Sequence, residues 1–286
     1  MGNTNDALSA MEKVKLFGGG APVFLLAAAT LQERAGHLEA ADNGYRMAVA
    51  SAVAQRNWDP GNRRWFNRQR AEFLARQGRH AEAQVEELRA LGVTPRDPDS
   101  ADGQVNLEPF YNAALEQSID RQDARWLNLS ALPKGRQSLG ETEFDIRGIV
   151  QLSSTGPSGK SSRIYPERVE GIPIGRTCQR IHFLHATEGE VANGTSVAMY
   201  RVHLRDGGVL DLPVVYGRDV LAWEDEICAA PTAARVAWQG RSPGTTRLRL
   251  FRTSWELPQP GQEVVRLDLV SQMTDSAPFL IAVTVE

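Results

Sequence analysis

The densest group of residues that could bind a ligand is an acidic and aromatic cluster within residues 219–226. Carboxylates in such a cluster can accept sugar hydroxyls or bind Ca²⁺, and a tryptophan ring can serve as a stacking platform. A solvated turn beside a buried tryptophan is the alternative interpretation. The ligand-binding candidates are Asp219, Trp223, Glu224 and Asp225, and carbohydrate is the candidate ligand.

Three histidines are the next residues with chemical potential. His182 and His185 are three positions apart, so on the strand predicted there they point to opposite faces and cannot chelate a metal together. His203 could join one of them across a sheet, but no carboxylate accompanies them in sequence. We therefore predict no metal site and no cofactor.

Nucleophile and phosphate motifs are incomplete. The stretch 153–161 ends in Gly-Lys-Ser, but Ser154 stands where a phosphate-binding loop needs its first glycine. No Gly-x-Ser-x-Gly elbow occurs either. We predict no catalytic residue and expect a binding protein rather than an enzyme. The alternative is an enzyme of carbohydrate or ester chemistry, with Asp219 and Glu224 facing each other across about 5 to 10 Å.

Composition narrows the choice of partner and compartment. The 286 residues carry a formal net charge of -3 and a pI near 6.0, which disfavours nucleic acid as a partner. No secretory signal and no apolar run of bilayer length is apparent, so we expect a cytoplasmic protein without membrane insertion. Cys178 and Cys228 are expected to be buried thiols, with a single bridge as the alternative.

Residues 21 to about 118 are rich in helix formers and contain two similar segments. Each has a glycine followed by alanines five and twelve positions later, at Gly36, Ala41 and Ala48, then at Gly78, Ala83 and Ala90. Such a glycine suits the turn between antiparallel helices, and the alanines let those helices approach closely.

This spacing resembles the tetratricopeptide repeat. Tyr45 and Pro95 match that pattern, whereas Glu87 departs from it, and the two turns are 42 residues apart where the family period is about 34. A plain bundle of helical hairpins is the alternative. Repeat arrays bind peptides or helices, and the basic and aromatic residues Arg63, Arg64, Trp65 and Arg68 are the candidates for binding a protein partner. The alternative is a solvated helix face with its aromatic rings turned inward.

The remaining sequence predicts about eight strands without intervening helices, as in a β-sandwich or jelly roll. Asp206-Gly207-Gly208 predicts a hairpin turn, and the apolar run Arg180 to Ala186 predicts a central strand. The expected strands are Glu143–Leu152, Gln179–Thr187, Ser196–Arg205, Val209–Tyr216, Ala234–Gln239, Thr246–Trp255, Glu263–Ser271 and Pro278–Val285.

The first of these strands alternates in character. Phe144, Ile146, Val150 and Leu152 share one face, while Asp145, Arg147 and Gln151 lie mainly on the other. The pattern predicts one half-buried strand whose polar face meets solvent.

The β half also resembles a C-terminal β-sandwich module of planctomycete and verrucomicrobial proteins, which is attached there to tetratricopeptide arrays and, in some members, to serine/threonine kinase domains. The resemblance covers most of residues 125–286 and is carried by FDIRG at 144–148, FLHA at 183–186 and YGRD at 216–219. It implies a fold reminiscent of galactose-binding jelly rolls and a companion role to repeat arrays. Kinase activity does not carry over, because no kinase motif is present.

The sequence therefore predicts an α+β multidomain protein with residues 1–20 as a flexible N-terminus, 21–121 as a tetratricopeptide-like helical domain and 122–286 as a β-sandwich domain. Apolar residues at Leu107, Phe110, Tyr111 and Leu115 predict a capping helix, Leu107 to Ile119, that docks the two domains into one rigid body. We expect a non-enzymatic adaptor or scaffold whose repeats bind a protein and whose sandwich is a second binding module.

Overall fold

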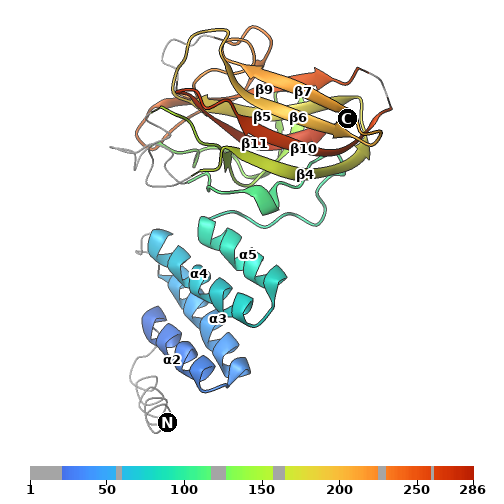
Figure 1. Cartoon of the computed structure of the whole chain (residues 1–286). Coiled ribbons are helices and arrows are strands. Elements are labelled where there is room, and N and C mark those ends of the chain that lie inside the picture. Colours follow the sequence, from blue (N-terminus) through green and yellow to red (C-terminus); the bar gives the residue numbers. More distant parts are fainter. Residues whose placement is uncertain (1–20, 56–59, 117–126, 157–164, 225–229, 259–260) are drawn as a thin grey trace. The chain divides into compact units, whose positions relative to one another are not determined.

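Helices occupy the first part of the chain and strands the rest, in a computed structural model that describes residues 21–55, 60–116, 127–156, 165–224, 230–258 and 261–286 (Figure 1). The chain divides into two compact units, Met1–Gly92 and Val93–Glu286. We refer to them as the helical unit and the β unit and describe each by itself. The mixed α+β class predicted from the sequence is confirmed.

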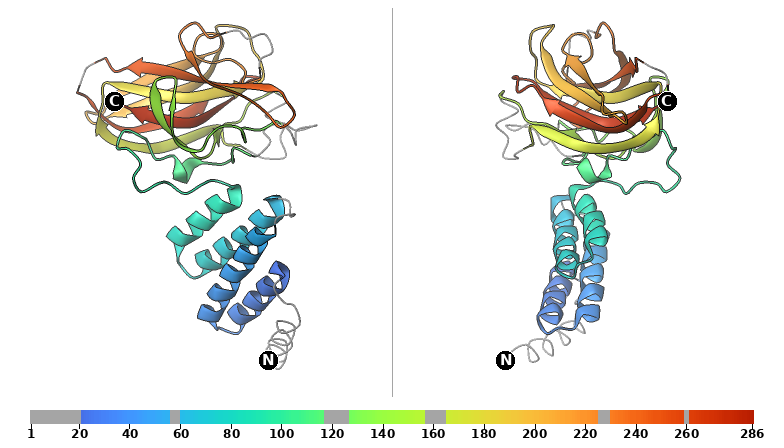
Figure 2. Two further views of the ribbon diagram at one scale, coloured as in Figure 1. Left: turned by 180° about the vertical axis from the view of Figure 1, so that it is seen from behind. Right: turned by 45° about the vertical axis from the view of Figure 1, so that its right-hand side comes forward.

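The helical unit contains two antiparallel helical hairpins that lie side by side (Figures 1 and 2). Helices α2 (Pro22–Arg34) and α3 (Leu38–Ala54) form the first, and α4 (Pro60–Arg76) and α5 (His80–Leu91) form the second. The turn glycines are confirmed, because Gly36 and Gly78 have φ of 80° and 73° in the two short connections. The spaced alanines are buried as expected, at positions 41, 48, 83 and 90.

Small and aromatic residues together build the core of the helical unit. A side chain at Gly44 would place its Cβ 2.9 Å from that of Ala29, so α2 and α3 approach each other closely there. The rings of Tyr45 and Phe73 stack with their centroids 4.8 Å apart. The hairpins are therefore held by close helix contact and aromatic packing, as their composition indicates.

The β unit contains eleven strands among its described residues, paired antiparallel in two sheets and one hairpin. One sheet has the order β4-β10-β6-β7, the other has the order β3-β11-β5-β9-β8, and β1-β2 stands apart. The bounds are β1 Gly135–Leu139, β2 Thr142–Ile146, β3 Val150–Gln151, β4 Arg168–Thr177, β5 Arg180–Glu188, β6 Ser196–Leu204, β7 Val209–Val215, β8 Arg235–Arg241, β9 Arg247–Glu256, β10 Glu263–Ser271 and β11 Ala277–Val285.

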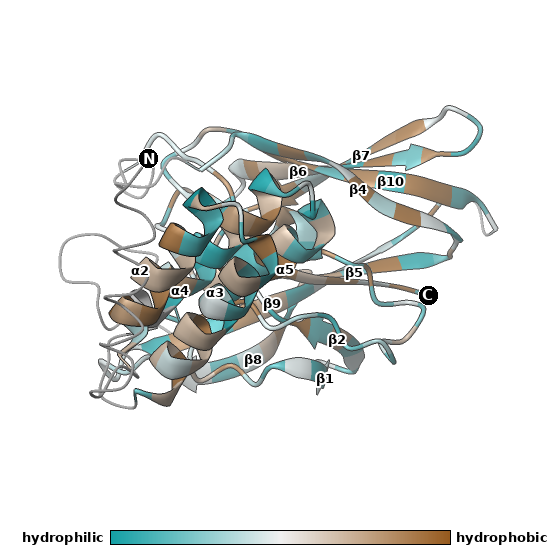
Figure 3. Ribbon diagram, turned by 90° about the horizontal axis from the view of Figure 1, so that it is seen from below, coloured by the Kyte–Doolittle hydropathy of each residue, from teal (hydrophilic) through white to brown (hydrophobic). Residues whose placement is uncertain are grey.

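The two larger sheets pack face to face as a β-sandwich. Phe183 on β5 stacks on Tyr200 of β6 with ring centroids 3.8 Å apart, and Trp255 meets both rings edge-on. Stretches of hydrophobic and hydrophilic residues alternate along strands such as β4 and β10 (Figure 3). Strand β5 is the middle strand of its sheet, and the turn at 206–208 joins β6 to β7 with Gly207 at φ 88°, so both expectations are confirmed.

The predicted strand Glu143–Leu152 is instead two short strands, β2 and β3. Its apolar face is buried as expected, but its polar face does not meet solvent, because Asp145, Arg147 and Gln151 are 6%, 1% and 1% exposed. Arg147 turns inward to ion pairs with Asp145 and Glu108, both at 2.9 Å. The predicted strand is interrupted at Arg147, because a buried arginine needs charged partners. The alternation of apolar and polar residues cannot predict those partners.

The predicted helix Leu107 to Ile119 is also different in its described part. Glu108–Phe110 forms a single turn of 3-10 helix, and Ala113 then pairs with Ile149 as an extended bridge. Pro109 within that turn and the hydrogen bonds of Asn112 and Ala113 to the Ile149 carbonyl draw the backbone away from a helix. The apolar residues at 107, 111 and 115 are buried, as the expected helix face required, whereas Phe110 is partly exposed.

The segment that follows Gly92 belongs to the β unit. The Val105 amide donates to the Val283 carbonyl and the Val285 amide to the Gly103 carbonyl, so this segment continues the edge of β11. The predicted domain boundary near Gln122 lies outside the described residues, as do residues 1–20. The compact units meet in sequence at Gly92 and Val93.

Candidate functional site

The outward face of α4 carries the residues predicted to bind a protein. Trp65 is 45% exposed, while its neighbour Phe66 is 2% exposed and lies in the core of the helical unit. The two rings meet edge-on, with centroids 4.9 Å apart. Phe66 therefore points inward, as the alternative of a solvated helix face predicts. Trp65 is exposed to solvent and rests on the buried ring of Phe66.

Two arginines accompany Trp65 on this face. Arg68 is exposed and Arg64 is partly exposed, one helical turn apart. Neither has an ion pair among the described residues, although the Arg64 guanidinium lies beside Gly92. The side chain of Arg63 lies outside the described part of α4. We call Arg64, Trp65 and Arg68 the α4 face. It offers an exposed ring and two cations whose charge is not neutralised.

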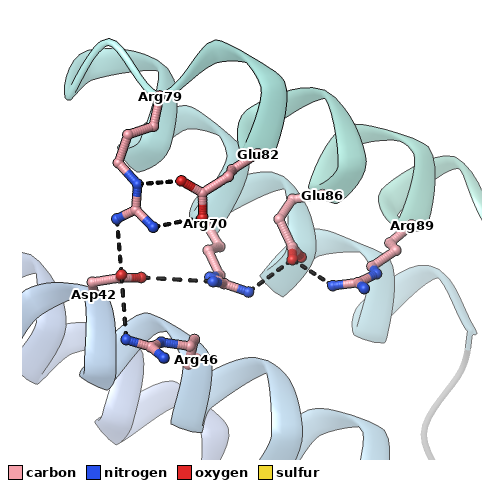
Figure 4. A network of polar contacts seen from close by, with 7 residues as sticks. All are labelled: Asp42, Arg46, Arg70, Arg79, Glu82, Glu86 and Arg89. Atoms are coloured by element: carbon pink, nitrogen blue, oxygen red, sulfur yellow. Dashed lines mark hydrogen bonds and ion pairs between the residues drawn. The ribbon is translucent and has the colours of Figure 1, made fainter. Parts of the chain in front are cut away.

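In a polar network on α3, α4 and α5, carboxylates form hydrogen bonds and ion pairs with arginines (Figure 4). Asp42 accepts a hydrogen bond from Arg79 at 2.8 Å and pairs with Arg46 at 3.4 Å and with Arg70 at 3.7 Å. Arg79 also donates to both oxygens of Glu82. Asp42 thus fixes three arginines from three different parts of the helical unit.

Glu86 is the second centre of this network. It is 2% exposed and accepts hydrogen bonds at 2.7 Å from both Arg70 and Arg89. Arg70 links the two carboxylates, because it contacts Asp42 as well as Glu86. The network, defined as Asp42, Arg46, Arg70, Arg79, Glu82, Glu86 and Arg89, therefore ties both hairpins together.

The network favours the charged form of two of its acids, Asp42 and Glu82. Burial acts to raise the pKa of Asp42, but the hydrogen bond from Arg79 and the charges of the neighbouring arginines outweigh it and hold that pKa below its usual value. The hydrogen bonds from Arg79 lower the pKa of Glu82. Residues 21–92 contain ten arginines, no lysine and eight acidic residues. Arginines therefore exceed acidic residues by two over this range, which gives the helical unit a small formal excess of positive charge.

The acidic and aromatic cluster of the β unit has a different arrangement from the one a sugar site needs. Trp223 is 0% exposed and packs edge-on against Phe279, with centroids 5.7 Å apart. Asp219 is 2% exposed, and its carboxylate accepts hydrogen bonds from the Val215 amide at 2.8 Å and from Arg218. In this conformation Trp223 offers no ring face to a ligand, and Asp219 is engaged in fixing its own loop.

The two remaining members of that cluster are Glu224 and Asp225. Glu224 is partly exposed and has a partner within the chain, whereas Asp225 lies outside the described residues. Cys178 is a free, buried thiol, and Cys228 again lies in an undescribed stretch.

The histidines lie on opposite faces of β5, as the strand periodicity predicts. His185 points into the sandwich, where its two ring nitrogens lie 3.0 Å from the Tyr200 hydroxyl and 2.8 Å from the Thr253 hydroxyl. Burial lowers the pKa of His185 to about 3, so its ring is neutral. His203 pairs with Asp268 at 2.6 Å. Among the described residues no group of three or more His, Cys, Asp or Glu is placed to hold a metal.

A polar pocket on the outer face of the five-stranded sheet is the site that sequence reasoning missed. It has a volume of about 420 Å³ and contains His182, Ser254 and Glu286, together with two arginines. His182 lies opposite Ser254 because β5 pairs with β9 in that register. The two residues are 72 positions apart, and no local pattern marks their contact.

Comparison with known proteins does not assign the chain to a family. No protein-family model matches the chain, and a search of curated proteins finds no match. Helices α2 to α5, with the rest of the described chain, include none with the length and apolar character needed to span a bilayer. The resemblance of the β half to a bacterial sandwich module therefore stays a prediction.

Proposed function

We propose that the protein is an adaptor whose helical unit, without chemistry of its own, binds an acidic segment of a protein partner across the α4 face. The observation that carries this proposal is the exposure of Trp65 between two arginines that have no ion pair within the described part of the chain. Tryptophan and arginine are the side chains most enriched among residues that dominate binding energy at interfaces. Acidic residues of a partner would supply the charge that the α4 face lacks.

The chemistry of the α4 face suggests the form of the ligand. Arg64 and Arg68 are one turn apart, so two carboxylates at a similar spacing can meet both guanidinium groups. An apolar side chain between those carboxylates would cover the ring of Trp65. An amphipathic helical segment with acidic residues flanking a leucine or phenylalanine has this arrangement.

The tetratricopeptide interpretation of the helical unit agrees with this proposal, since such arrays hold peptides or helices and have no chemistry of their own. The glycine turns and buried alanines support it, while the 42-residue spacing does not. In the same proposal the β unit, as a jelly-roll-like module, acts as a second interaction platform.

Fluorescence anisotropy with labelled peptides tests the proposal on the full chain. The probes are an amphipathic helix with glutamates on its polar face and a matched peptide with lysines there. We expect only the acidic peptide to bind, and we expect its affinity to fall at least ten-fold in Trp65→Ala and Arg68→Glu and to weaken with added salt.

The matched control is Arg34→Glu, which reverses an exposed charge at the end of α2, away from the α4 face in sequence. This variant should bind the acidic peptide with affinity within about two-fold of the unmodified chain, as expected for a charge outside the interface. Equal binding of both peptides, or equal weakening by Arg34→Glu and Arg68→Glu, would contradict the proposal.

A further inference from the structure

The pocket on the outer face of the β unit is built by a hairpin that crosses a sheet. In the left view of Figure 2 the green β1–β2 hairpin lies in front of the five-stranded sheet. The Thr284 hydroxyl of β11 donates to the Glu143 carbonyl at 2.6 Å, and Arg252 of β9 donates to the Thr142 hydroxyl at 3.0 Å. These contacts fix the hairpin beside the ends of β5 and β9, and the pocket lies between them.

A serine and a histidine meet inside this pocket. The Ser254 Oγ lies 2.7 Å from Nδ1 of His182, from directly paired positions of β9 and β5. His182 is 3% exposed, whereas Ser254 is exposed. A nucleophile that a substrate can reach is thus joined to a base that the sheet holds still.

A carboxylate faces the other nitrogen of the same imidazole. Glu286 Oε2 lies 3.2 Å from Nε2 of His182, although the N–H direction is not aligned well enough for a hydrogen bond. The Glu286 backbone exchanges hydrogen bonds with Arg180, and its carboxylate lies 3.7 Å from the Arg180 guanidinium. Arg180 therefore positions the third member of a Ser-His-Glu arrangement.

The electrostatics of His182 suit a base. Burial lowers the pKa of His182 more than the nearby Glu286 raises it, so the imidazole is neutral near pH 7. When Ser254 donates to Nδ1, the single ring proton stays on Nε2 and faces Glu286. This tautomer leaves Nδ1 ready to accept the serine proton.

The pocket also supplies cations for a developing negative charge. Arg252 lies two residues before Ser254 on β9 and therefore points to the same side of the sheet, and both line the pocket. Its Nε has no hydrogen-bond partner among the described residues, and one of its terminal nitrogens is bound to Thr142. A guanidinium at this position can stabilise an oxyanion formed on a carbon attached to Ser254.

We propose that Ser254 is a nucleophile that acts with His182 as base and Glu286 as positioning residue to hydrolyse small, polar acyl esters. The Ser254 Oγ forms a bond to the ester carbonyl carbon while its proton passes to Nδ1 of His182. The carbonyl oxygen takes up the electron pair as an oxyanion. When this tetrahedral intermediate collapses, the carbonyl re-forms, the bond to the alcohol oxygen breaks, and that oxygen takes the proton from the imidazolium. Water then adds to the acyl-serine by the same base and releases a carboxylic acid and the free serine.

The dimensions of the pocket set the substrate class. About 420 Å³ is near the lower end of the range for ligand sites, and the lining consists of charged and hydroxyl side chains. Acetyl and other short acyl groups fit such a site, whereas long aliphatic chains would bury apolar surface against charged groups. Three glutamates on the lining, Glu141, Glu256 and Glu286, disfavour an anionic leaving alcohol.

The first experiment uses the full chain with p-nitrophenyl acetate and p-nitrophenyl octanoate, and a fluorophosphonate probe with peptide mass analysis. We expect hydrolysis of the acetate at least ten-fold faster than of the octanoate, and labelling at Ser254. Ser254→Ala should remove labelling and return hydrolysis to the rate in buffer. The matched control, Ser138→Ala, changes an exposed serine on β1 and should leave both unchanged.

The second experiment separates chemistry from folding. His182→Gln should lower the acylation rate about 100-fold with an unchanged circular dichroism spectrum, as expected on removing a general base. Glu286→Gln should lower the rate less and move the acid limb of the pH profile to lower pH, because the imidazolium loses a stabilising charge. Labelling at sites other than Ser254, or a rate unaffected by Ser254→Ala, would overturn the proposal.

Discussion

The two units of this protein place charge and apolar surface in opposite ways. In the helical unit a network of seven side chains shares its ion pairs among several arginines, whereas in the β unit a single arginine, Arg147, which is 1% exposed, holds two carboxylates. Among the described residues the helical unit has six of the seven large apolar side chains that are exposed, and the β unit has only Val209. A shared network tolerates a loss, and exposed apolar residues provide binding surface. The comparison therefore predicts that the helical unit tolerates single charge substitutions and binds partners. It predicts that the β unit is sensitive to loss of its buried charge and exposes little apolar surface.

The largest expected effect comes from removing the concentrated charge. Arg147→Met leaves the buried Asp145 and the part-buried Glu108 without their cation, which should destabilise the β unit by about 3–5 kcal/mol. Native-state hydrogen exchange with mass analysis reports the β unit separately. The control is Arg136→Met, whose ion pair with Glu143 is about half exposed, at 55% and 51%, and should cost less than about 1 kcal/mol. Equal losses of stability in Arg147→Met and Arg136→Met would contradict the claim that the buried ion pair matters more than the exposed one.

The second largest effect is a difference between the two units in how their stability depends on pH. Burial lowers the pKa of His185 to about 3, while an unfolded histidine titrates near about 6.5. As the pH falls below about 6.5, the unfolded chain binds a proton that the folded β unit does not. The free energy of unfolding should then fall by about 1.4 kcal/mol per pH unit until the pH nears 3.

The helical unit should respond at lower pH. Asp42 and Glu82 have lowered pKa values, so their contribution is present above their unfolded pKa values and is lost only as the pH falls through the folded ones. Hydrogen exchange corrected for intrinsic rates, from pH 7 to 5, should show loss of protection in the β unit alone. His185→Phe should flatten that loss. Parallel loss in both units would contradict the assignment to His185.

A smaller effect is expected within the shared network. Asp42→Ala removes one centre of the network, but Arg79 keeps Glu82 and Arg70 keeps Glu86. We expect a cost of about 1–2 kcal/mol to the helical unit, less than for Arg147 because the arginines have other partners. Glu39→Ala, at an exposed position of the same helix, is the matched control and should stay within about 0.5 kcal/mol. A cost above that of Arg147→Met would reverse the comparison.

The smallest effect on stability is expected at Trp65. Trp65→Ala should change the free energy of unfolding by less than about 1 kcal/mol, since nearly half of the side chain is exposed. Its neighbour Phe66 is the internal control, because Phe66→Ala should cost about 3–5 kcal/mol. Urea denaturation of both variants measures the difference. If the two changes were equal, Trp65 would be a core residue and not a binding one.

Sequence reasoning succeeded where one local pattern determines the outcome. The repeated spacing of glycine and alanine predicts Gly36 and Gly78 as turn residues, and the tolerance of positive φ predicts the turn at Asp206-Gly207-Gly208. It failed at Arg147 and along residues 107–116, where contacts across about 40 positions decide the backbone. It also could not find Ser254 beside His182, since that contact exists only through the register of β5 and β9.

The same limit applies to the cluster around Trp223. Its composition predicted a binding loop, but the ring is used to pack against Phe279 of β11. The sequence distance between these residues conceals the contact, and acidic neighbours would be present in either case. Only Trp65, of the two tryptophans singled out for binding, is exposed.

The segment that supplies partners to Arg147 bears on how the protein can be divided for expression. Asn106 and Glu108 bind its guanidinium, and Tyr111 lies beneath it with the ring centroid 5.6 Å away. A recombinant fragment beginning near residue 122, where composition changes, would lack all three and expose one edge of β11. A fragment beginning at Val93 retains them. The boundary suited to cloning therefore lies between Gly92 and Val93, well before β1 begins at Gly135.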